Sequence, residues 1–205
     1  AEFTYYKKNP THITAELASD LLDALIDHDA ENIKHIKPQT FEQIKRAYAV
    51  SSSAFKFCDL TKVTIQFLEK VVSENPTLIQ HIYYPSKDVM KIALAKDLNV
   101  LVYIEKYLDD DMYNWLLSQN GLILEFIPAG KQTEELVLTA IRENLEAYKY
   151  ANVKTKATDM YVIQQDPTKV SWISFYWPEL IEEIISYNPR YLTKFLSMED
   201  VTDQK

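Results

Sequence analysis

The sequence predicts an all-α protein, an α-solenoid of about eight helix-turn-helix units of 22–24 residues. Three observations predict it. Only two glycines occur in 205 residues, which disfavours the tight turns of a sheet-rich fold. A helix-capping residue recurs at nearly constant spacing, and apolar residues keep fixed offsets from it. Because 47% of the residues are hydrophobic, the chain can bury a substantial core.

Each repeat is defined by one Asp, Asn or Ser residue, which we call the anchor. Its side chain can accept a backbone N–H at the start of a helix, and proline follows it directly in three repeats. A helix is therefore expected to begin after every anchor. The anchors are Asp29, Ser51, Asn75, Asp97, Asn120, Asn144, Asp166 and Asn188, separated by 22, 24, 22, 23, 24, 22 and 22 residues.

Apolar residues flank every anchor at the same offsets. Three residues before the anchor (−3) and four after it (+4), every repeat carries an apolar or aromatic residue, such as Leu117 and Leu124 around Asn120. Position +7 continues the pattern. This is helical spacing, so each repeat should consist of two short helices. Two such helices cannot bury their own apolar face, and successive repeats are therefore expected to stack.

The first helix of each repeat has its own start signals. Capping residues followed by acidic residues occur at Thr40, Ser86 and Thr133. The acidic run Asp109–Asp111 has the same explanation. Asp159 stands at −7, where the other repeats are apolar, so its helix is expected to start late or to shift and bury Met160.

The repeats predict a single domain over residues 1–205. Residues 1–13 are expected to form an N-terminal cap, residues 14–198 the repeats, and residues 199–205 a tail. In the stretch "SWISFYW", Trp172 belongs to the repeat pattern. The surplus aromatics Phe175, Tyr176 and Trp177 either seal the last repeat or form a second adhesive surface.

The segment from Tyr113 to Val153 combines an Asn-Gly, a Leu and an Ile-Pro with a charged turn and an apolar helix. The residues concerned are Asn120, Gly121, Leu124, Ile127, Pro128, Leu136, Val137, Ala140 and Ile141. In these features the segment resembles the helical-repeat family catalogued as domain of unknown function 4116. The resemblance implies an α-helical repeat array from bacteria, protists or their viruses, and it carries over no catalytic residue.

Charge and cysteine content limit the partners and the compartment. The net charge is −8 and acids outnumber bases in every third of the chain, which argues against nucleic acid. No stretch is as long as a membrane span, so no membrane partner is expected. Cys58 is the only cysteine, and a reducing cytoplasm of a bacterial or host cell fits best. Because it stands at +7, we expect a buried, inert thiol.

The remaining side chains predict no enzyme, cofactor or metal site. His35 and His81 stand at +6, a position with Phe57, Tyr103, Phe126, Tyr150 and Trp172 in other repeats, which suggests a structural role. The group Asp27, His28, Asp29 and Glu31 could imitate a metal cluster, but neighbouring residues on a helix point in different directions. Gly121 stands where other repeats have Pro, Ala, Leu or Ser and does not belong to a phosphate loop.

Surface recognition is the function that remains. Positions −5 and −2 of the first helices form a ridge beside the core positions, and this ridge carries aromatic and basic residues. The candidate partner-binding residues are Arg46, Lys70, Ile92, Trp115, Arg142 and Tyr161. The alternative is that the ridge packs between adjacent repeats.

Two functions follow from this ridge. The first is a non-enzymatic repeat protein that binds another protein through an extended concave surface, and a phage-encoded inhibitor of a host protein is one concrete version. The second is a protein that sequesters a small molecule or nucleotide. In that case Trp115, Tyr161 and the basic residues of the ridge would surround an anionic ligand.

Overall fold

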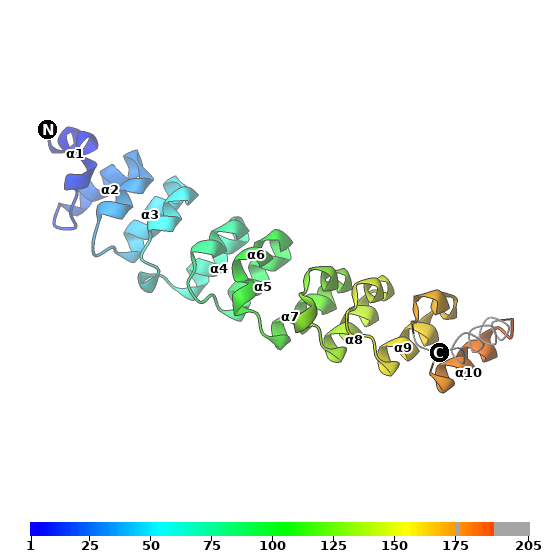
Figure 1. Ribbon diagram of the computed structural model, residues 1–205. Helices are drawn as coiled ribbons and strands as arrows, with labels where there is room; N and C mark the ends of the chain where they lie inside the picture. The colour runs from blue at the N-terminus through cyan, green and yellow to red at the C-terminus, as the bar shows by residue number, and fades with distance from the viewer. Residues whose placement is uncertain (175–176, 191–205) are drawn as a thin grey trace. The chain divides into compact units, whose positions relative to one another are not determined.

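A computed structural model describes residues 1–174 and 177–190, and these residues contain helices and no strand. The chain divides into two compact parts, residues 1–107 and 108–205, which we call the N-terminal half and the C-terminal half. Figure 1 shows short helices connected by loops in both. The prediction of an all-α protein is confirmed, and each half is described by itself.

The first helices of the repeats are uniform. Eight α-helices of ten residues each end at the residue before an anchor. The anchor N–H donates to the carbonyl four residues earlier, over 2.8–3.1 Å, which closes the last turn. The bounds are α2 (Ser19–His28), α3 (Phe41–Val50), α4 (Ile65–Glu74), α5 (Lys87–Lys96), α7 (Asp110–Gln119), α8 (Glu134–Glu143), α9 (Lys156–Gln165) and α10 (Pro178–Tyr187).

The second helices are mostly 3-10 helices of six residues. They are η2 (Ala30–His35), η3 (Ser52–Phe57), η5 (Pro76–His81), η8 (Gly121–Phe126), η10 (Leu145–Tyr150) and η11 (Pro167–Trp172). After Asp97 three short pieces follow instead, η6 (Leu98–Val100), α6 (Leu101–Ile104) and η7 (Glu105–Tyr107). Leu192 and Phe195, the predicted core residues after Asn188, lie outside the described residues.

Most anchors cap the second helix as predicted. Five anchor side chains accept the backbone N–H two residues ahead in these helices: Asp29, Asp97, Asn120, Asn144 and Asp166. Ser51 and Asn75 bond instead to the hydroxyls of Ser53 and Thr77. A short side chain with an oxygen is thus used at every one of these turns, although not always for the backbone.

The predicted caps of the first helices are confirmed at Thr40, Ser86, Thr133 and Asp109. Thr64 and Thr155 cap α4 and α9 in the same way and were not predicted. The expectation that the helix around Asp159 starts late is wrong, because α9 begins at Lys156 in register with the others. Asp159 is only 3% exposed and occupies the core position itself.

The core consists of the residues that the pattern placed there. In the described residues, position −4 is buried in every repeat, and −3, +4 and +7 are buried or half-buried. In the N-terminal half, α2 packs on α3 and α4 on α5, while η2 packs on η3 and η3 on η5. In the C-terminal half, α7, α8, α9 and α10 pack in chain order. Neighbouring repeats within each half therefore share their apolar faces.

The remaining helices lie at the N-terminus and in the two longest repeats. The N-terminal half begins with α1 (Glu2–Lys8) and η1 (Pro10–His12), which lead into the first core cluster through Tyr6 and Ile13. The two 24-residue repeats each contain one additional 3-10 turn, η4 (Leu60–Lys62) and η9 (Ala129–Lys131). The longer repeats thus place their extra residues after the second helix.

Two buried glutamines tie successive repeats together. Gln39 Nε2 donates to the carbonyls of Ile33 and Phe57, over 3.0 and 2.9 Å, and its Oε1 accepts the Asp59 N–H over 2.7 Å. Gln132 does the same in the C-terminal half, donating to carbonyls that include those of Leu124 (3.3 Å) and Tyr150 (3.2 Å) and accepting the Asn152 N–H (2.8 Å). In both cases a Gln-Thr pair precedes the first helix, so one side chain satisfies the ends of two neighbouring 3-10 helices.

Candidate functional site

The three ridge residues of the N-terminal half do not form one open surface. The Arg46 guanidinium on α3 donates to Asp27 over 2.8 and 3.0 Å and lies 3.1 Å from Asp23, so it joins α3 to α2. Lys70 on α4 lies 3.8 Å from Glu74 one turn later. Ile92 on α5 is half-buried.

The other three ridge residues belong to the C-terminal half. Trp115 on α7 and Tyr161 on α9 are half-buried, whereas Arg142 near the end of α8 is exposed. Beside them, the Thr139 hydroxyl bonds to Asn114 over 3.0 Å and connects α8 with α7. Part of the ridge therefore packs between neighbouring first helices.

A groove separates α3 from α4 in the N-terminal half. It encloses about 810 Å³, and its lining includes Lys45, Tyr48, Val50, Phe67, Lys70 and Glu74. The Phe67 ring contacts the rings of Phe41 and Tyr48 edge to face, at centroid distances of 5.4 and 5.7 Å. These bulky side chains stand between the two helices, and the Tyr48 hydroxyl donates to Glu74 over 2.8 Å. The groove is open and carries one lysine from each helix, Lys45 from α3 and Lys70 from α4.

A different set of aromatic residues lies on the second helices. We call it the ladder: the residues at +6, one in each described repeat, namely His35, Phe57, His81, Tyr103, Phe126, Tyr150 and Trp172. Phe126 is 63% exposed and Tyr103 41%, and none of the seven is buried. In a 3-10 helix side chains three apart eclipse each other, so +4 and +7 share the core side while +6 lies off it. The expected structural role of His35 and His81 is therefore not one of core packing.

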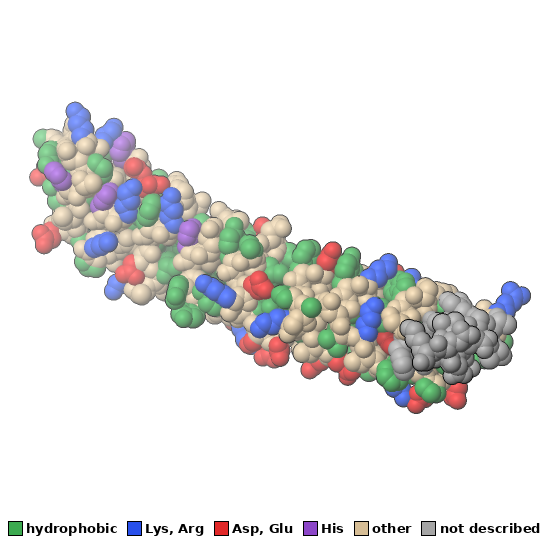
Figure 2. All heavy atoms as spheres, viewed as in Figure 1, with side chains coloured by type: hydrophobic (Ala, Val, Ile, Leu, Met, Phe, Trp, Pro, Cys, Tyr) green, Lys and Arg blue, Asp and Glu red, His purple; other side chains and the backbone are tan. Residues whose placement is uncertain are grey.

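In the N-terminal half, two lysines lie over one ring of the ladder. Lys34 and Lys56 have their ammonium groups 5.2 and 4.7 Å from the centre of the Phe57 ring. Glu31 lies between them, 3.2 Å from Lys34 and 3.6 Å from Lys56. Figure 2 shows lysine and histidine side chains interleaved with hydrophobic ones over this half.

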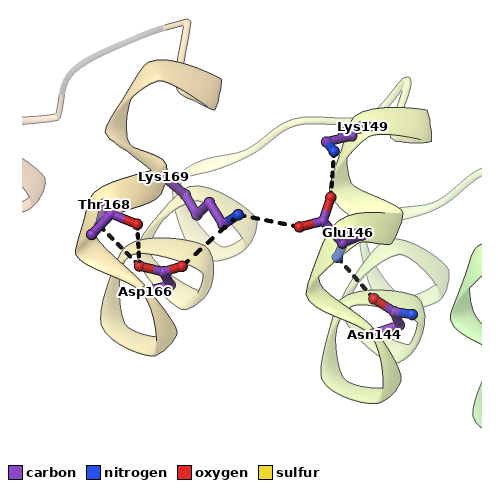
Figure 3. A network of polar contacts seen from close by, with 6 residues as sticks. All are labelled: Asn144, Glu146, Lys149, Asp166, Thr168 and Lys169. Carbon is purple, nitrogen blue, oxygen red and sulfur yellow. Dashed lines mark hydrogen bonds and ion pairs between the residues drawn. The ribbon is translucent and has the colours of Figure 1, made fainter.

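The C-terminal half repeats this arrangement with different residues. Lys149 and Lys169 lie 4.9 and 4.3 Å from the centre of the Trp172 ring system. Glu146 forms ion pairs with both, at 3.2 Å for Lys169 (Figure 3). These two bonds hold the pKa of Glu146 below its ordinary value, so it stays ionised and keeps both lysines in place.

We call each of these groups a clamp: two lysines over one aromatic ring, bridged by one glutamate. The N-terminal clamp comprises Glu31, Lys34, Lys56 and Phe57, and the C-terminal clamp Glu146, Lys149, Lys169 and Trp172. In both, the glutamate and one lysine come from one repeat, and the ring comes from the next. Each clamp thus connects two neighbouring repeats.

The two histidines of the ladder carry little charge at neutral pH. Burial lowers the pKa of His35 and of His81, and the nearby ammonium groups of Lys34 and Lys56, respectively, lower it further. Both rings therefore act at pH 7 as neutral, aromatic members of the ladder. Their environment gives no sign of a proton-transfer role.

The surroundings of the Cys58 thiol disfavour its reactive form. Burial raises the pKa of the Cys58 thiol to about 12, and the thiol donates weakly to the Ala54 carbonyl. Within residues 1–174 and 177–190, no group of three or more His, Cys, Asp or Glu side chains is arranged to hold a metal ion. In the same residues, no helix has the length and apolar character needed to cross a membrane.

Comparison with known proteins adds no relative. No family model, no curated protein and no solved structure matches this chain.

The ladder and the clamps differ from the site predicted from sequence. The sequence did show an aromatic or His at +6, together with Lys34, Lys56 and Lys149 at +5. Their role was missed because hydrophobic residues at a fixed offset resemble core positions. Of the predicted set, Lys70 lines the groove, Arg46 is held by two carboxylates, and the remaining four lie on separate first helices.

Proposed function

We propose that this chain is a non-enzymatic helical-repeat protein that binds another protein through the ladder. The observation that carries the proposal is the recurrence of an aromatic or histidine side chain at +6, exposed at His81, Tyr103, Phe126 and Tyr150 and half-buried in the other three described repeats. A helix face that contacts only water gains no stability from aromatic side chains. Aromatic side chains on a surface are, by contrast, the type that contributes most to protein–protein binding energy.

We also propose that the repeats of both halves continue as one α-solenoid, which would present the ladder as an extended surface. The uniform first helices and the shared faces of neighbouring repeats support this arrangement. Small-angle X-ray scattering tests it. A compact protein of this length has a radius of gyration of about 17 Å, whereas the solenoid should clearly exceed about 20 Å. A value near the compact limit would reject the solenoid.

The partner test compares two variants that each remove two exposed apolar side chains. Phe126→Ser with Tyr150→Ser removes two ladder rings, and Ile65→Ser with Tyr187→Ser removes two exposed apolar residues elsewhere. Affinity purification from the native cell with mass spectrometry should recover a partner with the wild type and the control. The ladder variant should lose it. Equal recovery by all three proteins would refute the proposal. A host protein as partner would fit a phage-encoded inhibitor, the version that the family resemblance supports.

The groove between α3 and α4 favours a second candidate function, sequestration of a small anionic ligand. Lys45 on α3 and Lys70 on α4 line this groove together with the aromatic rings of Tyr48 and Phe67. A nucleotide would place its phosphate near the ammonium groups and its base on the rings. A thermal-shift screen against nucleotides tests this candidate. A shift that disappears in Lys70→Ala would support it, and no shift with any nucleotide would dismiss it.

A further inference from the structure

The two clamps share three of their four positions: the glutamate at +2, one lysine at +5 and the ring at +6 of the next repeat. The second lysine is Lys56 at +5 in the N-terminal clamp but Lys169 at +3 in the C-terminal clamp, and the ring is Phe in one and Trp in the other. The second lysine thus comes from different positions in the two halves, yet in both it lies over the ring at +6. This recurrence favours a role for the ammonium groups beside the rings of the ladder.

The N-terminal clamp has one positive charge in excess, because two ammonium groups face the single carboxylate of Glu31. In the C-terminal clamp Lys169 also lies 4.0 Å from Asp166, so two ammonium groups face two carboxylates. In both clamps each ammonium has three N–H donors, more than its ion pairs use. Lys34, Lys56 and Lys149 are also largely exposed, with 40–52% of each side chain accessible. The clamps thus keep hydrogen-bond donors directed to solvent next to a hydrophobic ring.

The acidic character of the chain resides on the first helices. These eight helices hold sixteen acidic and eight basic residues, whereas the segments between them hold nine of each. Five of those nine acids are occupied as helix caps: Asp29, Asp59, Asp97, Asp109 and Asp166. The segments that carry the ladder are therefore balanced in charge, although the chain as a whole is acidic.

From these observations we propose that the clamps bind carboxylates of an acidic, aromatic-containing segment of the partner protein, an inference that rests on the proposed function. A partner carboxylate accepts the free N–H donors of the two lysines, and its apolar neighbours pack on adjacent rings of the ladder. Glu31 and Glu146 hold the lysines in position before binding, which lowers the entropy lost on association.

A nucleic acid fits the clamps less well. Base stacking requires a free ring face, but lysine side chains cover the Phe57 and Trp172 rings. A clamp with at most one excess charge also suits isolated carboxylates better than a continuous phosphate backbone, which needs a concentrated basic surface.

Fluorescence polarisation with defined probes tests the inference. The probe is a fluorescein-labelled 16-residue peptide of four Asp-Phe-Ser-Gly repeats, and the counter-probes are its Lys-Phe-Ser-Gly analogue and a thymidine 16-mer. The wild type should bind the acidic peptide, more weakly as salt is raised, and should bind neither counter-probe comparably. Absence of binding to the acidic peptide, or equal binding of a counter-probe, would overturn the inference.

Two charge-matched variants locate the binding. Lys56→Gln with Lys149→Gln removes one lysine from each clamp, and Lys8→Gln with Lys96→Gln removes the same charge from α1 and α5, outside the clamps. The clamp variant should bind the acidic peptide roughly fivefold or more weakly, and the control less than about twofold. Equal losses in both would assign the effect to net charge and overturn the clamps as the site. Lys34→Gln with Lys169→Gln replaces the clamp variant if its circular dichroism melt shows loss of fold.

The outcomes separate this inference from the proposed function. If a cellular partner depends on Phe126 and Tyr150 while the acidic peptide does not bind, protein binding stands and the acidic chemistry is wrong. If the acidic peptide binds through the clamps while no partner depends on the ladder rings, the lysines bind carboxylates without the aromatic surface.

Discussion

The Tyr148 hydroxyl donates a hydrogen bond of 2.5 Å to the buried carboxylate of Asp159, and the Trp177 indole N–H donates to the other oxygen over 3.2 Å. Burial, this bond and the adjacent negative charge raise the pKa of Tyr148 above its ordinary value, so the hydroxyl remains a donor at any physiological pH. Two residues that are distant from Asp159 in sequence thus satisfy its carboxylate at a core position.

Removing the donor from this group should destabilise the protein. Tyr148→Phe leaves Asp159 buried with one direct partner fewer, and we expect a loss of about 1–3 kcal/mol in the free energy of unfolding. The double variant Tyr148→Phe with Asp159→Leu should recover much of this loss, because the buried carboxylate is then removed together with its shortest hydrogen bond. Urea denaturation of the single and double variants measures both effects. A double variant less stable than Tyr148→Phe would contradict the explanation.

The two glycines should respond in opposite ways to alanine. A Cβ atom on Gly121 would overlap the Ala140 carbonyl oxygen, because the start of η8 approaches the backbone of α8 closely. We expect Gly121→Ala to lower stability by about 1–3 kcal/mol. At Gly130 nothing lies within 4 Å of the added atom, and neither glycine has a positive φ.

Gly130→Ala is therefore the matched control and should be neutral or stabilising by about 0.4–1 kcal/mol, since it restricts the unfolded chain. Thermal unfolding followed by circular dichroism compares the two variants. Equal melting temperatures would show that α8 can move away from η8 at little cost.

The buried glutamines should be difficult to replace by apolar residues. Gln39→Leu leaves the Phe57 carbonyl and the Asp59 N–H without their partner, and Gln132→Leu does the same for the Tyr150 carbonyl and the Asn152 N–H. We expect each substitution to cost about 1–3 kcal/mol in chemical denaturation. Hydrogen exchange should show the clearest local effect, with faster exchange at the amides of residues 59 and 152. Unchanged exchange there would mean that water replaces the glutamine fully.

The Cys58 thiol should react slowly while the protein is folded. Its pKa of about 12 lies above the ordinary value, so the protonated form persists through neutral and mildly alkaline pH and the reactive thiolate appears only as the pH approaches 12. At pH 8 about one thiol in ten thousand is ionised by this value. Alkylation by iodoacetamide at pH 8, followed by mass spectrometry, should be far slower in buffer than in urea. Similar rates would show that the site opens readily.

The sequence predicted the repeat well because its signals are local. The Asn120 side chain caps the second helix by accepting the N–H two residues ahead, and the Asn120 N–H closes the first helix by donating to the carbonyl four residues earlier. The apolar offsets depend only on helical spacing. The 3-10 form of the second helices could not be distinguished from an α-helix, because a spacing of three between +4 and +7 fits both.

The environment of individual side chains was harder to predict. Asp159 is satisfied by residues 11 and 18 positions away, which no local pattern connects. The ladder was misassigned for a different reason. Position +6 points away from the side shared by +4 and +7 in a 3-10 helix and in an α-helix alike, so helical spacing already places Phe126 off the core, and only the recurrence of apolar residues there suggested a structural role. The clamps require contacts between repeats that spacing alone does not define.

The first helices all have ten residues, and the extra residues of the two longest repeats lie in η4 and η9. An insertion at those turns can move one second helix against the next without altering the packing of the ten-residue helices. Under the proposed function, the spacing of successive ladder rings can thus vary from repeat to repeat while the first helices keep a constant length.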